Sequence, residues 1–110
     1  MAPGVEAPEW AWNSGGFSSI THTADELSVV CAESAVPQGV QCERGWRAFK
    51  IEGPLDFALV GILASVAVPL AEAGVSIFAI STYDTDYIMV KGKDVESAVR
   101  ALAGAGHRVV

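Results

Sequence analysis

The stretch that decides the fold is Gly74-Val75-Ser76-Ile77-Phe78-Ala79-Ile80-Ser81-Thr82-Tyr83-Asp84-Thr85-Asp86-Tyr87-Ile88-Met89-Val90. Apolar residues, many of them β-branched or aromatic, fill its two halves, and a polar corner, residues 81–86, lies between them. Two such runs around a short polar corner are typical of a β-hairpin. Upstream, Gly53-Pro54-Leu55-Asp56 leads from another predicted strand, 46–51, into a helix. Two corners of this kind, brought together, predict a small polar pocket at one edge of a sheet.

The longest predicted helix begins at Asp56, a good N-cap residue, and ends before Gly74, a residue type favoured just after a helix. Pro69 is expected to bend its last turns. The side opposite its apolar stripe carries small or apolar residues, so we expect this helix to be covered by the sheet and by a neighbouring helix. The apolar stripe itself recurs at helical spacing and comprises Leu59, Ile62, Leu63, Val66 and Leu70.

A second helix is predicted over 95–102, capped by Asp94 and stopped by Gly104-Ala105-Gly106, before a final strand over 107–110. Residues 46–110 therefore have the order β-α-β-β-α-β, which predicts an α+β fold of the ferredoxin-like type. The sheet is expected to be antiparallel, with both helices on one face.

The first 45 residues are predicted to form a partial unit. A disordered segment or loose arm over 1–7, and one helical turn or an aromatic plug over 8–12, precede a hairpin of strands 17–22 and 26–31. This hairpin can be aligned on the later one: residues 17–23 match 77–83, and after an inserted Asp84 residues 24–30 match 85–91, pairing Asp25 with Asp86. We therefore expect two domains, residues 1–45 and 46–110.

Composition excludes several function classes. A net charge of −6 with seven unclustered Lys and Arg residues argues against nucleic acid and anionic membranes. The uncharged run 57–71 is shorter than the roughly 20 residues of a spanning helix. Cys31 and Cys42 are interpreted as buried or half-buried free thiols, with one disulfide as the alternative. The sequence shows no metal-ligand spacing around its two histidines and no nucleophile-elbow motif, so we expect no metal, no cofactor and no catalysis.

Several segments together carry a resemblance: residues 17–31, Gly45-Trp46-Arg47, Glu52-Gly53-Pro54-Leu55-Asp56-Phe57 and Ser81-Thr82-Tyr83-Asp84-Thr85-Asp86-Tyr87. They resemble a small bacterial ACT-domain family related to the ACT domains of cytosolic arginine sensors and of lysine-sensitive aspartokinases. The resemblance implies tandem ACT-like units that bind an amino acid at an interface between units. It also implies a cytoplasmic, allosteric, dimeric regulatory domain. The alternative is a structural or protein-interaction module with the same fold and no ligand. The leading strand that the family pattern places before Pro8 is not found.

A free amino acid needs N–H donors for its carboxylate and oxygen acceptors for its ammonium group. The donors are expected from a helix N-terminus after Gly53-Pro54, and the acceptors from Glu52, Asp84, Asp86 and nearby carbonyl groups. The acidic corner favours a basic or neutral ligand. Alternatives stay open: Asp56 as a cap only, Asp84 and Asp86 as turn residues only. The candidate ligand-binding residues are Glu52, Gly53, Pro54, Leu55, Asp56, Phe57, Ile80, Ser81, Thr82, Tyr83, Asp84, Thr85 and Asp86.

Overall fold

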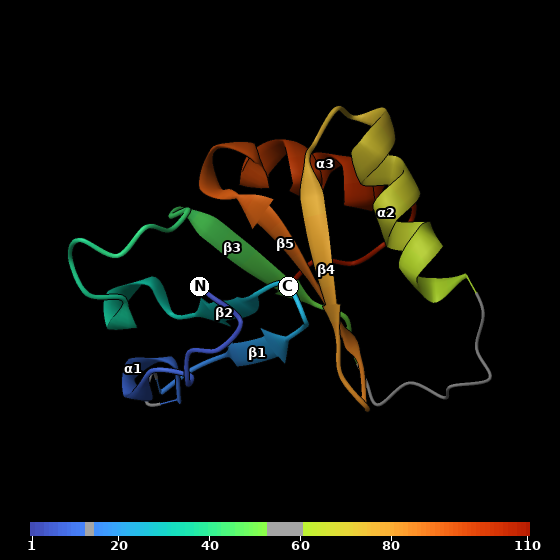
Figure 1. The fold of residues 1–110 in the computed structure, drawn as a ribbon. Helices are drawn as coiled ribbons and strands as arrows, with labels where there is room; N and C mark the ends of the chain where they lie inside the picture. The colour runs from blue at the N-terminus through green and yellow to red at the C-terminus, as the bar shows by residue number, and fades with distance from the viewer. Residues whose placement is uncertain (13–14, 53–60) are drawn as a thin grey trace. The chain divides into compact units, whose positions relative to one another are not determined.

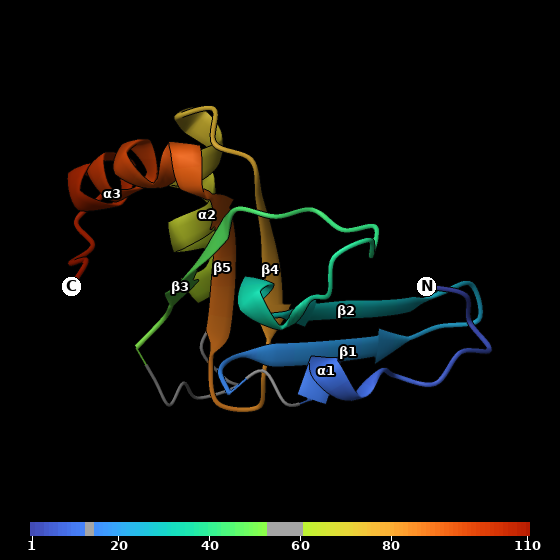
Figure 2. The same ribbon diagram turned by 90° about the vertical axis from the view of Figure 1, so that its left-hand side faces the viewer.

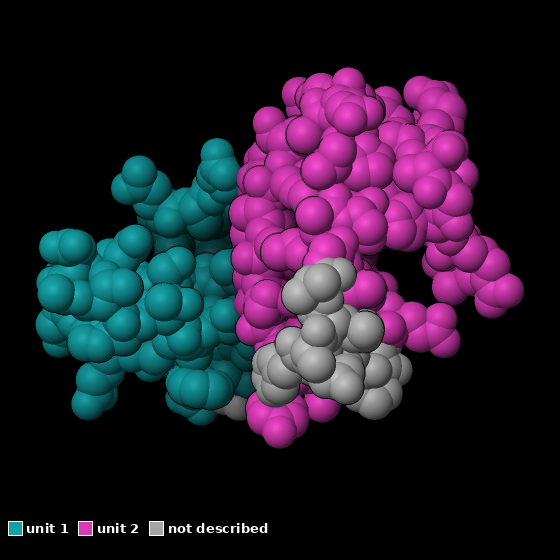
Figure 3. All heavy atoms as spheres, turned by 90° about the vertical axis from the view of Figure 1, so that its right-hand side faces the viewer, with its two compact units in different colours: residues 1–44 teal, residues 45–110 magenta. Residues whose placement is uncertain are grey.

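The computed structural model describes residues 1–12, 15–52 and 61–110. It contains two compact units, residues 1–44 and residues 45–110, which Figure 3 distinguishes by colour. The division expected from the sequence lay after residue 45.

The second unit has the expected ferredoxin-like α+β arrangement (Figures 1 and 2). Its sheet has the strand order β3-β5-β4, with both pairs antiparallel. The helix α2 joins β3 to β4, and β5 lies between these two strands, which is the split βαβ pattern. The elements are β3 (Trp46–Lys50), α2 (Ile62–Glu72), β4 (Ile77–Ser81), β5 (Asp86–Lys91), the 3₁₀ turn η2 (Gly92–Asp94) and α3 (Val95–Gly104).

The predicted final strand over 107–110 is wrong, since no strand is assigned there. The reason lies in how α3 ends. Gly106 adopts a positive φ of 94°, and the N–H of His107 donates to the carbonyl of Leu102 at 2.9 Å. The N–H of Gly106 also donates to the carbonyl of Ala103 at 3.1 Å, and the two bonds form a Schellman motif, so the start of the predicted strand belongs to the helix terminus. Val109 instead packs against the core.

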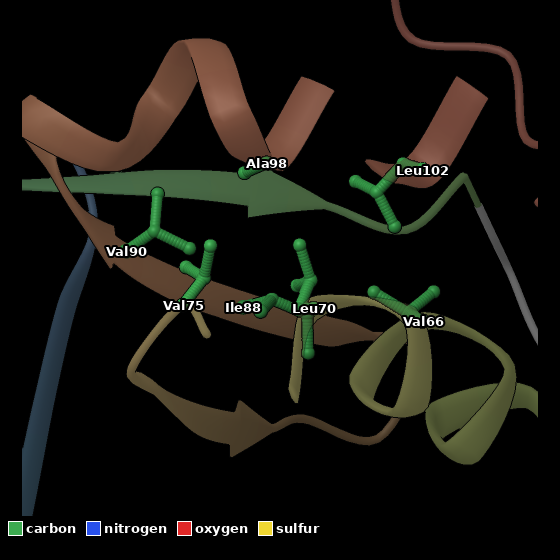
Figure 4. Close-up of a cluster of buried hydrophobic side chains, with 7 residues drawn as sticks. All are labelled: Val66, Leu70, Val75, Ile88, Val90, Ala98 and Leu102. Carbon is green, nitrogen blue, oxygen red and sulfur yellow. The ribbon is translucent and has the colours of Figure 1, made fainter. Parts of the chain in front are cut away.

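One apolar core holds the second unit together (Figure 4). Both helices contribute to it, so both cover the same face of the sheet, as expected. Leu70, Ile88 and Val90 are fully buried. Each such side chain contributes about 1.5–3 kcal/mol on burial. The buried residues of this core are Val66, Leu70, Val75, Ile88, Val90, Ala98 and Leu102.

The described part of α2 starts later than the sequence suggested. Ile62 is its first residue and Gly61 its N-cap, with φ of 79° and no side-chain cap; the expected start at Asp56 lies outside the described residues. The expected end is confirmed. Gly74 has φ of 76°, its N–H donates to Ala71, and the N–H of Val75 donates to Leu70, so α2 also ends in a Schellman motif.

The predicted faces of α2 are only partly correct. Val66 and Leu70 are buried as expected, but Leu63 is 37% exposed. On the side predicted to be covered by a neighbouring helix, Val68 is 51% exposed, and Ala64 and Ser65 are exposed as well. The helix α3 does contact α2, but it does not cover that side, which is apolar and reaches solvent.

The other face of the sheet carries an aromatic cluster. Trp46 of β3 and Phe78 of β4 meet edge to face, with ring centroids 4.7 Å apart and planes at 74°. The ammonium group of Lys91 lies 4.7 Å from the Trp46 centroid, within range of a cation–π interaction. This cluster spans the three strands on the face opposite the helices.

The first unit forms the expected hairpin. The strands β1 (Ser18–His22) and β2 (Leu27–Cys31) pair antiparallel, with Ser18 opposite Cys31 and His22 opposite Leu27. The short helix α1 (Glu9–Trp12) contacts both strands, and the 3₁₀ turn η1 (Glu33–Ala35) follows β2.

The interpretation of residues 1–7 as a loose arm is wrong. The backbone of Met1 exchanges two hydrogen bonds with Leu27, both 2.9 Å. Nε2 of His22 lies 2.8 Å from the carbonyl oxygen of Pro3. The hairpin therefore holds the beginning of the chain through backbone and side-chain bonds.

The first unit repeats part of the second without gaps. Ser18 lies 59 residues before Ile77, Leu27 lies 59 residues before Asp86, and η1 begins 59 residues before η2. The same offset places Gly15, with φ of 74°, on Gly74, with φ of 76°. It also places Ala11 on Leu70, and both are fully buried. The alignment proposed from the sequence, with Asp84 as an insertion, is therefore wrong.

Candidate functional site

The corner between β4 and β5 is closed by a threonine side chain. Ser81 and Asp86 are the last pair of the ladder. Within the loop, the N–H of Thr82 donates to the carbonyl of Thr85 at 2.8 Å, and the N–H of Thr85 donates to Oγ1 of Thr82 at 3.2 Å. Tyr83 and Asp84 form the tip, where Tyr83 is 80% exposed. Thr82 therefore supplies the turn hydrogen bond that a backbone carbonyl would otherwise accept.

A second threonine joins this corner to the end of β3. Thr85 is only 5% exposed, and its Oγ1 donates to the carbonyl of Ile51 at 2.6 Å. The N–H of Ile51 in turn donates to the carbonyl of Asp86 at 3.0 Å. The chain that leads into the predicted helix corner is thus bonded to the hairpin corner as far as Ile51. Glu52, the next residue, is exposed.

A hydroxyl group orients the carboxylate of Asp86. Oγ of Ser81 donates to Oδ1 of Asp86 at 2.5 Å across the last pair of the two strands. A carboxylate offers about four acceptor positions, so this bond fixes its direction and leaves capacity for further donors. Asp86 is half-buried and Ser81 exposed. The arrangement suits the binding of an ammonium or guanidinium group.

Eight of the candidate ligand-binding residues are described, and five are not. The structure gathers the end of β3, the end of β4, the loop and the start of β5 at one edge of the sheet. Gly53, Pro54, Leu55, Asp56 and Phe57 lie outside the described residues. The described candidates are Glu52, Ile80, Ser81, Thr82, Tyr83, Asp84, Thr85 and Asp86.

The first unit has a corner with the same turn. The N–H of Thr23 donates to Glu26 at 2.9 Å, and Oγ1 of Thr23 accepts from the N–H groups of Asp25 and Glu26. Thr23 and Asp25 occupy the positions of Thr82 and Asp84 at the 59-residue offset. The spacing Thr-x-Asp was the signal in the sequence that would have given this alignment.

The two corners differ where the strands end. His22 and Leu27 stand where the second unit has Ser81 and Asp86. The oriented carboxylate therefore belongs to the second corner alone. Asp84, by contrast, occupies a position that both corners share.

Other kinds of site find no support in the described residues. Across residues 1–12, 15–52 and 61–110, no group of three or more His, Cys, Asp or Glu side chains is placed to hold a metal ion. Within the same ranges, no helix is long and apolar enough to cross a membrane. Cys31 and Cys42 are free thiols; Cys31 is half-buried as expected, but the predicted burial of Cys42 is wrong, since its side chain is exposed. Burial, and then the neighbouring Cys42, raise the pKa of the Cys31 thiol above its ordinary value.

The fold and one family model together define the class of domain. The family model described as an ACT domain matches residues 41–104, more than half of the chain. The chain belongs to the ACT-domain family. A second family model, describing an N-terminal domain, matches residues 3–39.

Curated relatives carry a more specific name. The cytosolic arginine sensor for mTORC1 subunit 1 of Bos taurus is 40% identical over an alignment of 98 residues, and the match covers 79% of this chain and 30% of the relative. The Homo sapiens protein of the same name is 40% identical over 58 residues, 52% of this chain and 18% of the relative. The chain thus spans less than a third of the length of these relatives.

Two solved structures are similar over most of the chain. A crystal structure of an Agobacterium tumefaciens protein superposes with a TM-score of 0.92 at 43% identity, covering all of this chain and 81% of the other. A Vibrio cholerae protein, described as of unknown function and a possible transport protein, gives a TM-score of 0.65 at 27% identity. That match covers 81% of this chain and 69% of the other.

Proposed function

We propose that this chain is a non-catalytic regulatory domain that binds a free amino acid at the corner of residues 81–86. The carboxylate of Asp86, held by Ser81, is the observation that carries the proposal. It accepts a hydrogen bond from a positively charged group of the ligand, which favours a basic or neutral amino acid over an acidic one. The relatives named as arginine sensors support the same ligand class.

The contacts around the corner support this role because they fix the acceptor before any ligand arrives. Thr82 closes the loop, Thr85 ties it to Ile51, and Ser81 orients the carboxylate. A preorganised acceptor lowers the ordering cost of binding. The backbone N–H groups of Leu55, Phe57 and Ala58, after the Gly53-Pro54 corner, are the candidate donors for the ligand carboxylate and remain part of the proposal.

A thermal-shift panel of the twenty amino acids tests the proposal. A ligand at 100 times its Kd stabilises the folded state by about 2.7 kcal/mol, which gives a clear rise in melting temperature. We expect a rise with arginine or another basic or neutral amino acid. Absence of any rise at millimolar concentrations with all twenty would refute amino-acid binding.

Matched variants locate the site. Asp86→Asn keeps the shape and a hydrogen bond to Ser81 but removes the charge, so we expect the ligand-induced rise to disappear. Asp25→Asn is the control, because Asp25 lies in the first corner, where no such carboxylate is oriented, and it should keep the rise. Asp84→Asn removes the other candidate acceptor of the second corner, so a rise that survives Asp86→Asn but not Asp84→Asn would place the ligand at the tip of the loop instead.

The second candidate function is a ligand-free interaction module that pairs with another copy of the chain in the cytosol. The exposed apolar side chains of α2, Leu63 and Val68, favour it, since an apolar helix side at the surface marks a contact area. Sedimentation analysis of the free protein tests it. If the protein is a monomer at all concentrations and an amino acid raises its melting temperature, self-association is excluded and amino-acid binding is the function that remains.

A further inference from the structure

Pro69 leaves one carbonyl of α2 without its usual donor. In an α-helix the carbonyl of residue 65 accepts from the N–H of residue 69. Proline has no N–H, so Pro69 removes this bond and exposes the Ser65 carbonyl to another partner. An unsatisfied carbonyl in a helix costs free energy unless another donor or water reaches it.

His107 supplies the missing donor from the end of another helix. Its Nε2 lies 2.8 Å from the carbonyl oxygen of Ser65, 42 residues away in the chain. A carbonyl only accepts, so Nε2 carries the hydrogen. The Schellman motif at Gly106 fixes the backbone of His107 through the bond to Leu102 and so positions the imidazole from the end of α3.

Ser65 is also the residue that closes the first turn of α2. Its N–H donates to the carbonyl of Gly61 at 2.8 Å, and its Oγ donates to the carbonyl of Ile62 at 2.6 Å. Gly61 provides no side-chain cap. The first turn of α2 therefore depends on Ser65, and Ser65 is bonded to His107.

We propose that Pro69 and His107 form a latch between α2 and the segment after α3, so that the first turn of α2 and residues 106–110 open as one conformational unit. Pro69 creates the acceptor, and His107 occupies it. The first unit has no counterpart of this latch, because Trp10 stands at the position of Pro69 at the 59-residue offset. The proposal does not depend on the amino-acid-binding role.

A double-mutant cycle with Pro69→Ala and His107→Ala tests the latch on the whole chain. In the natural background, His107→Ala should lower the folding equilibrium constant about fivefold, the usual effect of one lost hydrogen bond. In the Pro69→Ala background, the introduced alanine supplies the N–H, so the same change should cost less than about twofold. Equal losses in both backgrounds would overturn the latch.

His22→Ala is the matched control, since His22 also bonds a backbone carbonyl, that of Pro3, but in the first unit. Its effect should be the same in the natural background and in the Pro69→Ala background.

Hydrogen exchange supplies a second measurement that does not need a stability difference. His107→Ala should speed exchange of the Ser65 amide by the same factor as amides 106 and 107. Faster exchange at 106 and 107 with Ser65 unchanged would overturn the coupling. Nitrogen NMR of the ring should show the hydrogen on Nε2, and an Nδ1–H tautomer would equally contradict the latch.

Discussion

The hairpins of residues 18–31 and 77–90 have the same length, the same pairing and the same threonine-closed turn. They differ at the positions that flank the turn. The first has His22, Glu26 and Leu27, and the second has Ser81, Thr85 and Asp86. The shared residues make the turn, and the differing residues orient a carboxylate and bind the end of β3. The two hairpins therefore share the residues that build the turn, and the candidate site consists of the residues in which they differ.

The two units also separate after their 3₁₀ turns, at a pair of equivalent valines. Val95 is helical, with φ −57° and ψ −45°, and begins α3. Val36 is extended, with φ −80° and ψ 120°. Pro37 follows Val36, and a proline disfavours the helical conformation of the residue before it. One proline thus explains why the first unit has no helix at the position of α3.

The largest expected effect concerns Leu70, a buried residue whose equivalent position in the first unit is occupied by the buried Ala11. Leu70→Ala gives α2 the residue that the first unit has there, but the core of the second unit has been packed around leucine. We expect a loss of about 2–5 kcal/mol, measured by chemical denaturation. Val68→Ala, at an exposed position of the same helix, should cost less than about 0.5 kcal/mol. Similar losses for both would mean that α2 does not bury Leu70 and expose Val68.

The next effect concerns the hydrogen bond from Thr85 to the carbonyl of Ile51, which has no equivalent at Glu26 in the first corner. Thr85→Val keeps the shape of the buried side chain but removes the hydroxyl that donates to Ile51. An unpaired carbonyl should reduce the free energy of unfolding by about 1–3 kcal/mol. Glu26→Ala, at the equivalent exposed position, is the control and should have little effect. A neutral Thr85→Val would show that water replaces the hydroxyl.

A smaller and equal effect is expected for the two shared threonines. Thr82→Ala and Thr23→Ala each remove the side-chain acceptor that closes a turn. Each should cost about 1 kcal/mol, comparable with the loss of a helix cap. Melting temperatures of the two variants provide the comparison. A large difference between them would contradict the equivalence of the two corners.

The smallest effect is expected at the shared aspartates. Asp25 and Asp84 are both exposed, and exposed substitutions away from special contacts change stability by less than about 0.5 kcal/mol. Asp25→Ala and Asp84→Ala should therefore leave the melting temperature nearly unchanged. A marked loss at Asp84 alone would show that the second corner uses this residue in a way that the first does not.

The sequence predicted correctly the elements that have a strong hydrophobic periodicity and are bounded by turn residues or glycines. Both hairpins, the stops of both helices before Gly74 and Gly106 and the ferredoxin-like order follow from β-branched runs, turn residues and glycines. The split βαβ order adds the pairing that brings β3 beside β5, and with it Ile51 beside Thr85.

The parts that sequence reasoning missed depend on the register that a turn sets, on how a helix ends and on what covers the face of a helix. The alignment of the two hairpins failed because it matched Ile20 with Ile80, whereas the pairing of strands fixes the register from the turn. The prediction of a final strand over 107–110 is wrong because the motif that ends α3 uses the N–H of His107. The prediction that Leu63 is buried is wrong because the apolar stripe on α2 is wider than the surface that the sheet and α3 cover.

The aromatic cluster on the sheet provides a fluorescence signal that reports on the second unit. Trp46 is the sole tryptophan of residues 45–110, while Trp10 and Trp12 belong to the first unit. The Lys91 ammonium lies 4.7 Å from the Trp46 ring, so the indole emits in the electric field of a nearby charge. With Trp10 and Trp12 replaced by phenylalanine, the fluorescence wavelength follows the second unit alone, and its unfolding can be timed separately from that of the first.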